Sequence, residues 1–141
     1  MRIMAIDYGD AHTGIAVSDP TGFLAGFTTV IDAYRPDIVA ERIALLAREH
    51  GAERLVLGHP INMDGTRGPR SEKAQAMRQL LEEATGLPVV LWDERRTTID
   101  AHQILLNSGK NAKKRKKVVD AVAASLILEG YLTYLKSHPE G

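Results

Sequence analysis

The sequence predicts an α/β domain with a five-stranded mixed sheet and helices on both faces. The first observation is that three short runs of β-strand character follow one another near the N-terminus, with only turns between them. The second is that strand-like and helix-like segments alternate along the rest of the chain. Three consecutive strands form an antiparallel meander, and the alternation adds two more strands with their helices, so we expect one mixed sheet.

The N-terminal strands are predicted over residues 2–7, 13–18 and 23–31. A turn at 9–12 joins the first two strands, and a turn at 19–22 joins the next two. Glycine, proline and aspartate in these turns favour a tight reversal of the chain. Connections this short join antiparallel strands, which is why we expect a meander.

Two helices with one apolar face each are predicted next, and a glycine ends each of them. The first begins at Pro36 and ends at Gly51, and its apolar face comprises Val39, Ile43, Leu46 and Ala47. The second ends at Gly86, and its apolar face comprises Met77, Leu80, Leu81 and Ala84.

The remaining elements follow from the segments between and after these helices. A strand over 54–58 and a loop over 59–69 lie between the two helices, and a fifth strand is predicted over 88–92. Two final helices are predicted over 97–107 and 116–136.

Length and composition indicate one domain over residues 1–141. The chain is 44% hydrophobic and 26% charged, and at 141 residues it is long enough to bury a sizeable core. Its longest apolar runs are too short to cross a bilayer. It has no cysteine and no charged-then-apolar leader, so we expect a cytoplasmic protein without membrane association.

Charge is unevenly distributed, although the formal net charge is zero. No acidic residue lies between Asp100 and Asp120, and the basic residues gathered there are Lys110, Lys113, Lys114, Arg115, Lys116 and Lys117. Such a run attracts the phosphates of nucleic acid. The simpler interpretation is a solvated charged loop, but its place directly before Asp120 favours a binding role.

Acidic residues stand at the ends of two apolar strands. Asp7 closes the first strand on the same face as Ile3 and Ala5, and a carboxylate in that position needs partners, a metal or an open strand end. Asp93 and Glu94 follow the last strand, one on each face, and periodicity does not decide which of them shares the face of Asp7. If the two strands are parallel neighbours, their carboxyl ends share the edge where ligand sites form. Taken alone, Asp7 is better explained as an aspartate that opens a turn, and one of Asp93 and Glu94 is equally well explained as an acid that complements the dipole of the next helix.

A third acid, Asp120, lies near the start of the last helix. One core-facing stripe of that helix comprises Val118, Val122, Ser125, Leu128, Leu132 and Leu135. Asp120 heads a second stripe with Ala124, Ile127 and Tyr131, so we expect it to face inward near the edge of the sheet. Taken alone, Asp120 is better explained as an acid that complements the helix dipole.

Three acids at the ends of apolar elements predict a metal site. Gathered carboxylates repel one another unless a hard divalent cation holds them, and Mg²⁺ or Mn²⁺ suits oxygen ligands best. Two such ions activate water and stabilise the leaving oxygen in phosphodiester hydrolysis. Zinc fits less well, because the chain has no cysteine and its five histidines form no close pair.

Four segments together resemble the YqgF family, also called RuvX. They are Asp7-Tyr8-Gly9 with 14–17, the stretch 58–65, Asp93-Glu94-Arg95 with Thr97-Thr98, and residues 117–128. The resemblance covers nearly the whole chain in order. It implies an RNase H-like fold and an activity described as Holliday junction resolution or pre-16S rRNA cleavage. It also implies that Asp7, one of Asp93 and Glu94, and Asp120 are the catalytic acids.

Two residues depart from the family pattern. His59 stands where leucine is usual, and we expect this lone histidine of a loop to be solvated. Arg96 stands where an apolar or aromatic residue is usual, and it either grips a phosphate or is an exposed charge. Arg67, Arg70 and Arg95 are further expected contacts to nucleic acid. Because only 5% of the residues are aromatic, we expect binding through the phosphate backbone instead of base stacking.

Several functions remain open from the sequence. The first is a metal-dependent nuclease in 5′-end maturation of precursor 16S rRNA, and the second is a Holliday junction resolvase. The third is a non-catalytic module that binds RNA or a ribosome-assembly partner, although every candidate acid is present. An actin-like or sugar-kinase ATPase resembles the chain only over residues 7–19 and needs two lobes. A monomer and a homodimer both remain open, and we expect Phe23 and Phe27 in the core.

Overall fold

The structure is a computed structural model that describes residues 1–19, 25–59, 68–93 and 112–137. Within these ranges it describes every side chain except those of residues 25, 69–70 and 112–120. The predicted helix over 97–107 and the predicted core residue Phe23 lie outside the described residues. In the part of the chain that is described, no helix is long and apolar enough to span a membrane.

Five strands form one mixed sheet, as predicted. They are β1 (Ile3–Asp7), β2 (His12–Ser18), β3 (Ala25–Asp32), β4 (Arg54–His59) and β5 (Val89–Asp93), and their order in the sheet is β3-β2-β1-β4-β5. β1 pairs antiparallel with β2, and β2 with β3, so the predicted meander is confirmed. β4 runs parallel to both of its neighbours, β1 and β5.

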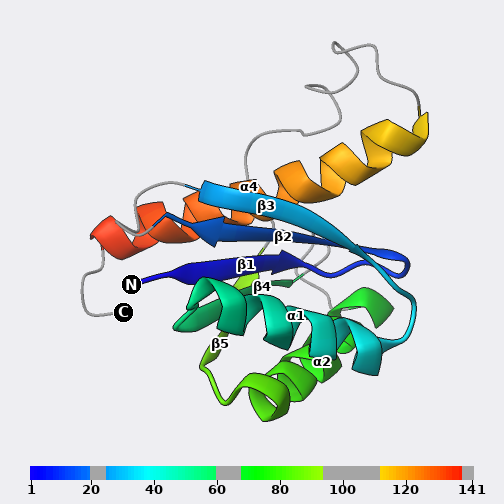
Figure 1. The fold of residues 1–141 in the computed structure, drawn as a ribbon, viewed down its shortest axis with the longest axis horizontal. Helices are drawn as coiled ribbons and strands as arrows, with labels where there is room; N and C mark the ends of the chain where they lie inside the picture. Colours follow the sequence, from blue (N-terminus) through cyan, green and yellow to red (C-terminus); the bar gives the residue numbers. More distant parts are fainter. Residues whose placement is uncertain (20–24, 60–67, 94–111, 138–141) are drawn as a thin grey trace.

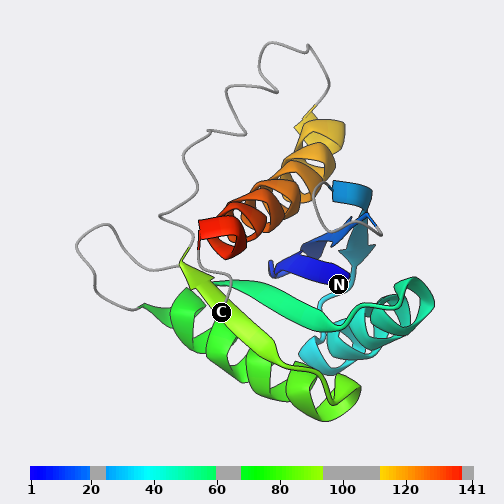
Figure 2. The same cartoon turned by 90° about the vertical axis from the view of Figure 1, so that its left-hand side faces the viewer.

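Helices cover both faces of the sheet (Figures 1 and 2). On one face lie α1 (Pro36–His50) and α2 (Pro69–Thr85), and α4 (Ala112–Ser137) crosses the other. Side-chain alternation divides the strands between two cores: Met4, Ile6 and Leu57 pack toward α1 and α2, whereas Ile3, Ala5 and Val56 pack toward α4. Each face of β1 is therefore buried under a helical layer.

The predicted helix ends are confirmed. Gly51 follows α1 and Gly86 follows α2, both in the left-handed conformation, with φ of 65° and 68°. A residue without a Cβ adopts this conformation without strain. The predicted apolar face of α2 is wrong at one position, because Ala84 is exposed and Ala74 is buried instead.

Several element bounds differ from the prediction. β4 includes His59 and α2 begins at Pro69, so the predicted loop over 59–69 is too long at both ends. The last helix begins at Ala112, four residues before the predicted start at 116. Proline is well tolerated in a first helical turn, which is why Pro69 opens α2 instead of ending a loop.

Phe27 is not in the core, in contrast to the prediction. It lies on β3, which is an edge strand, and it is 37% exposed. Its ring stacks on that of His50 at the end of α1, with 4.3 Å between ring centroids. An edge strand has a neighbouring strand on one side only, so an aromatic side chain there is only partly covered.

Candidate active site

Asp7 is the last residue of β1, the central strand of the sheet. It alternates with Ile3 and Ala5, whose side chains pack toward α4, so Asp7 lies on the α4 face as the sequence predicted. The residues before it on the strand are fully buried, whereas Asp7 is only half-buried. The carboxylate therefore lies at the boundary between the buried core and the solvent-exposed surface.

Glycines flank Asp7 on both neighbouring strands. Gly14 on β2 is its partner in the antiparallel pairing. On β4, Leu57 is the partner of Ile6, and the same register carried on by one residue brings Gly58 beside Asp7. Neither glycine has a side chain, so no side chain from these two positions covers the carboxylate of Asp7.

A close backbone contact explains why residue 9, two residues after Asp7, is a glycine. A Cβ built on Gly9 would lie 2.4 Å from the backbone carbonyl oxygen of His12. This contact is too short for any side chain, so the turn between β1 and β2 closes only around glycine. The position of this turn fixes where β1 ends and therefore where Asp7 lies.

Replacing Gly9 by alanine is expected to disturb both stability and activity. The added methyl group displaces the turn, and overpacking of this kind costs about 1–3 kcal/mol. A matched control is Gly51→Ala, which strains a left-handed residue with no atom within 4 Å of the new Cβ. Thermal melting should fall for both variants, but nuclease activity, assayed below the melting transition, should fall for Gly9→Ala alone. Equal activity in the two variants would show that the turn does not position Asp7.

Asp93 ends β5 on the face opposite to Asp7. The alternate residues Val89 and Leu91 pack toward α1 and α2, whereas Trp92 packs toward α4. β1 and β5 are parallel but are not neighbours, because β4 lies between them. The carboxyl ends of the two strands do lie at the same edge of the sheet, but Asp93 and Asp7 lie on different faces. Glu94 lies outside the described residues.

Asp120 lies in α4, one helical turn before Ala124. The best-buried positions of this helix include Ala124, Ile127 and Tyr131, which are at most 2% exposed. These three belong to the stripe that Asp120 heads, whereas Val122 and Ser125 of the other predicted stripe are only half-buried. Leu128 and Leu132 of that other stripe are buried as well, so both stripes contribute to the face of α4 that packs on the sheet, and the side chain of Asp120 itself lies outside the described residues.

The basic residues predicted to bind nucleic acid are distributed over three parts of the chain. The backbone of α4 begins with Lys113, Lys114, Arg115, Lys116 and Lys117. In Figure 1 this end of α4 lies toward the end of the sheet where the turn between β1 and β2 is found. Arg70 lies in the first turn of α2. Arg67, Arg95, Arg96 and Lys110 lie outside the described residues.

His59 is buried, so the prediction of a solvated histidine is wrong. It is 6% exposed, and its Nε2 lies 2.6 Å from the hydroxyl oxygen of the fully buried Ser71 on α2. This hydrogen bond ties the end of β4 to the first turns of α2. The sequence reasoning missed Ser71, because the loop was expected to reach Pro69 and to leave His59 in solvent.

Tyr8 and two charged residues lie on the α1 and α2 side of the same edge. The ammonium of Lys73 on α2 lies 2.9 Å from a carboxylate oxygen of Asp10. Burial raises the pKa of the Tyr8 hydroxyl; Lys73 opposes this shift and Asp10 adds to it. Tyr8 therefore stays protonated and neutral at physiological pH, and it adds no negative charge beside Asp7.

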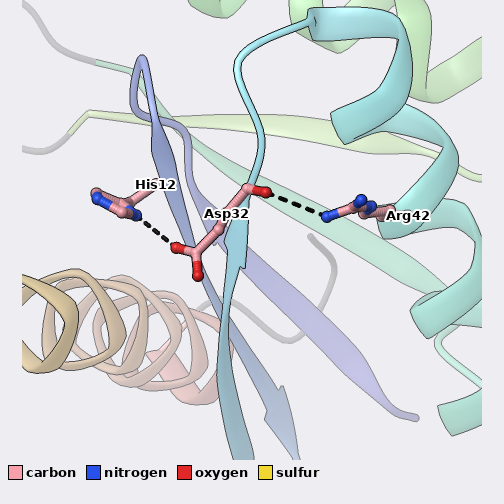
Figure 3. A network of polar contacts seen from close by, with 3 residues as sticks. All are labelled: His12, Asp32 and Arg42. Carbon is pink, nitrogen blue, oxygen red and sulfur yellow. Dashed lines mark hydrogen bonds and ion pairs between the residues drawn. The ribbon is translucent and has the colours of Figure 1, made fainter.

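His12 and Asp32 form a pair on the α4 face that the sequence did not predict (Figure 3). They are partners across β2 and β3, and Nδ1 of His12 lies 2.5 Å from a carboxylate oxygen of Asp32. Arg42 of α1 donates to the backbone carbonyl of Asp32 at 3.2 Å. The antiparallel pairing brings together residues 12 and 32, which are 20 residues apart in the sequence. No local sequence pattern indicates such a contact.

The donor set suits a hard divalent cation. Of the four predicted acids, only Asp7 and Asp93 have described side chains, and across the described residues no three His, Cys, Asp or Glu side chains gather. Asp7 is nevertheless a half-buried carboxylate with glycines on either side, and oxygen ligands of this kind fit Mg²⁺ or Mn²⁺. A carboxylate in the position of Asp7 is compatible with such a metal.

The fold defines the class of the protein. An antiparallel meander continued by two parallel strands, with helices on both faces, is the RNase H-like fold predicted from the sequence. Two structures of Thermus thermophilus RuvC share it, one of them in complex with a Holliday junction substrate. Their TM-scores are 0.64 and 0.58, each at 16% identity over 95% of this chain and 96% of the other.

The chain belongs to the RuvX family. The family model, described as Holliday junction resolvase, matches residues 1–134. The relative from Bacillus licheniformis is 44% identical over 97% of this chain and 100% of its own length, and that from Listeria monocytogenes is 45% identical over 94% and 97%. The relative from Halothermothrix orenii is 43% identical over 95% and 96%. All three bear the name "Putative pre-16S rRNA nuclease".

Proposed function

We propose that this protein is a metal-dependent nuclease that cleaves precursor 16S rRNA. The observation that carries the proposal is the position of Asp7, half-buried at the end of the central strand and flanked by glycines, in a member of the RuvX family. Acids gathered at one edge of a sheet repel one another, and a bound cation offsets that repulsion. The relatives of 43–45% identity are named as nucleases of the same precursor.

The proposed metal ligands are Asp7, Glu94 and Asp120. Asp93 follows Leu91 onto the α1 and α2 face, away from Asp7, and Glu94 is the acid that remains next to it in the sequence. The helical period assigns Asp120 to the stripe of α4 that packs on that same face. Strand alternation thus favours Glu94 over Asp93 as the second acid, a choice that the sequence left open.

The chemistry divides between the metal and the chain. Mg²⁺ or Mn²⁺, as a pair of ions in the proposed site, lowers the pKa of water and stabilises the leaving oxygen of a phosphodiester. Asp7, Glu94 and Asp120 hold the cations, and Gly14 and Gly58 leave space beside Asp7 for the phosphate. The basic residues at the start of α4 neutralise neighbouring phosphates, together with Arg67, Arg70, Arg95, Arg96 and Lys110.

The choice between Asp93 and Glu94 gives a direct prediction. Glu94→Gln should lower the cleavage rate by more than about 100-fold, since even outer-shell partners of metal ligands are worth about 10- to 100-fold. Asp93→Asn should retain most of the activity, because its side chain lies on the other face of the sheet. Rates are measured at saturating Mn²⁺ on the same labelled RNA. The reverse order of the two variants would make Asp93 the ligand and would overturn the argument from alternation.

A second candidate function is resolution of DNA junctions. The description of the family favours it, and so does the fold shared with RuvC, which has been seen with a Holliday junction. Resolution requires symmetric cuts in two strands and hence a homodimer, whereas trimming an RNA end requires only a monomer. Precursor rRNA as substrate would place the activity in the cytoplasm.

The test is cleavage of labelled precursor 16S rRNA and of a four-way DNA junction by the same preparation, with Mg²⁺ or Mn²⁺. The proposal predicts metal-dependent cutting of the RNA and little cutting of the junction. Cutting of the junction alone would replace this function by the second candidate. If wild-type protein cuts neither substrate while binding the RNA, the protein is a binding module and the proposal fails.

A further inference from the structure

The His12–Asp32 pair lies on the same face of the sheet as Asp7. Asp7 pairs with Gly14, and His12 is two residues from Gly14 along β2, so its side chain points to the same side. Diagonal neighbours of this kind have side chains about 7–8 Å apart. Because Gly14 has no side chain, nothing on β2 separates His12 from Asp7.

Asp32 fixes the orientation of the imidazole. Its carboxylate lies against Nδ1 of His12, so Nδ1 is the nitrogen that carries hydrogen in this contact. Nε2 then points away from Asp32, and it makes no hydrogen bond within the described part of the chain. The side chain of His12 is 25% exposed, so a ligand reaches it from solvent.

The position of Asp32 is fixed from the other side of the sheet. Arg42 reaches its carbonyl oxygen from α1, while the carboxylate turns toward His12 on the α4 side (Figure 3). The carboxylate itself is 49% exposed, and it repels phosphate groups that approach closely. A neutral hydroxyl group is therefore a better ligand for the His12–Asp32 pair than a phosphate group next to the one expected at Asp7.

We propose that Nε2 of His12, oriented by Asp32, forms a hydrogen bond with a ribose 2′-hydroxyl of the RNA strand bound at Asp7. The contact to Asp32 holds Nδ1 and leaves Nε2 for a ligand, and the 2′-hydroxyl, which both donates and accepts, is the group that distinguishes RNA from DNA. His12 then makes the site selective for RNA. The inference rests on the proposed nuclease function, and it names the class of substrate that this site takes.

Binding of matched oligonucleotides tests the inference without any cleavage. The probes are a fluorescein-labelled single-stranded RNA and the all-deoxy strand of the same sequence with uracil retained, titrated in Ca²⁺ and followed by anisotropy. A neutral hydrogen bond corresponds to about two- to tenfold in affinity, so wild-type protein should prefer the RNA by that factor. His12→Ala and His12→Phe should lose the preference by weakening RNA binding alone.

Further variants separate this role from a structural one. His12→Gln keeps an acceptor and should restore part of the preference, whereas Asp32→Asn should weaken it by releasing the ring. His50→Ala is the matched control, because His50 stacks on Phe27 at the end of α1 and contacts no part of the site. It should bind both probes as wild type does.

Three results would overturn the inference. They are equal binding of the two probes by wild-type protein, an unchanged preference in His12→Phe, and equal weakening of both probes by the His12 variants. Absence of binding to either probe would also overturn it. If the protein binds with the predicted preference but cleaves neither precursor rRNA nor a junction, the nuclease proposal alone fails.

Discussion

Asp7→Asn is expected to abolish metal-dependent cleavage while leaving the fold intact. Asparagine keeps the size of the side chain but removes the charge that holds a divalent cation. Partners of metal ligands are worth about 10- to 100-fold, so loss of a ligand on the central strand should cost more than about 100-fold. The melting temperature should stay close to that of wild type, because the residue is only half-buried and asparagine matches aspartate in size. Single-turnover cleavage and thermal melting are measured on the same preparation.

Asp37→Asn is the matched control for this substitution. Asp37 is an exposed acid in the first turn of α1, it pairs with Arg35 at 2.8 Å, and its helix packs on the face of the sheet opposite to Asp7. Cleavage by this variant should equal that of wild type. Residual activity above a tenth in Asp7→Asn would show that the carboxylate is not a metal ligand, and cleavage would have to be assigned elsewhere.

Leu128→Ala is expected to give the largest loss of stability. Leu128 is fully buried on α4 and packs against the strands that carry Asp7 and Trp92. Truncation of a buried leucine to alanine costs about 2–5 kcal/mol. For a domain of this size, that corresponds to a fall in melting temperature of about 6–20 °C. Cleavage should fall as well, since the same helix carries Asp120.

Leu45→Ala provides the comparison for Leu128→Ala. Leu45 lies on α1 and is 53% exposed, so its truncation removes little buried surface. Its melting temperature should stay within a few degrees of wild type, as expected for surface substitutions of less than about 0.5 kcal/mol. A similar loss in both variants would mean that α4 contributes no more to the core than an exposed helix face.

The sequence predicted the order of helices and strands well because the residues that end these elements act locally. Gly51 and Gly86 end their helices, and short turns join the first three strands, so element order followed directly. The errors arose where tertiary contacts decide. Phe27 has strand character but lies on an edge strand, and Ala84 has the helical spacing of the buried face but faces solvent.

The candidate site could be predicted from the sequence only in part. Alternation along one strand placed Asp7 correctly, but the choice between Asp93 and Glu94 required the packing of Leu91 and Trp92 on opposite faces. Glu94 itself and the side chain of Asp120 lie outside what the structure describes, so their roles stay predictions. The His12–Asp32 and His59–Ser71 contacts depend on strand pairing and helix docking, which no local pattern encodes.

Binding of Mn²⁺ to the free protein tests the central claim most directly. The signal of unbound Mn²⁺ in electron paramagnetic resonance is followed during titration of wild type, Asp7→Asn and Asp37→Asn. If the acids at the carboxyl edge of the sheet form a metal site, wild type and Asp37→Asn bind Mn²⁺ with the same affinity, and Asp7→Asn binds it more than about 100-fold more weakly. Equal affinity in all three proteins would contradict the account, because the metal would then bind away from the central strand.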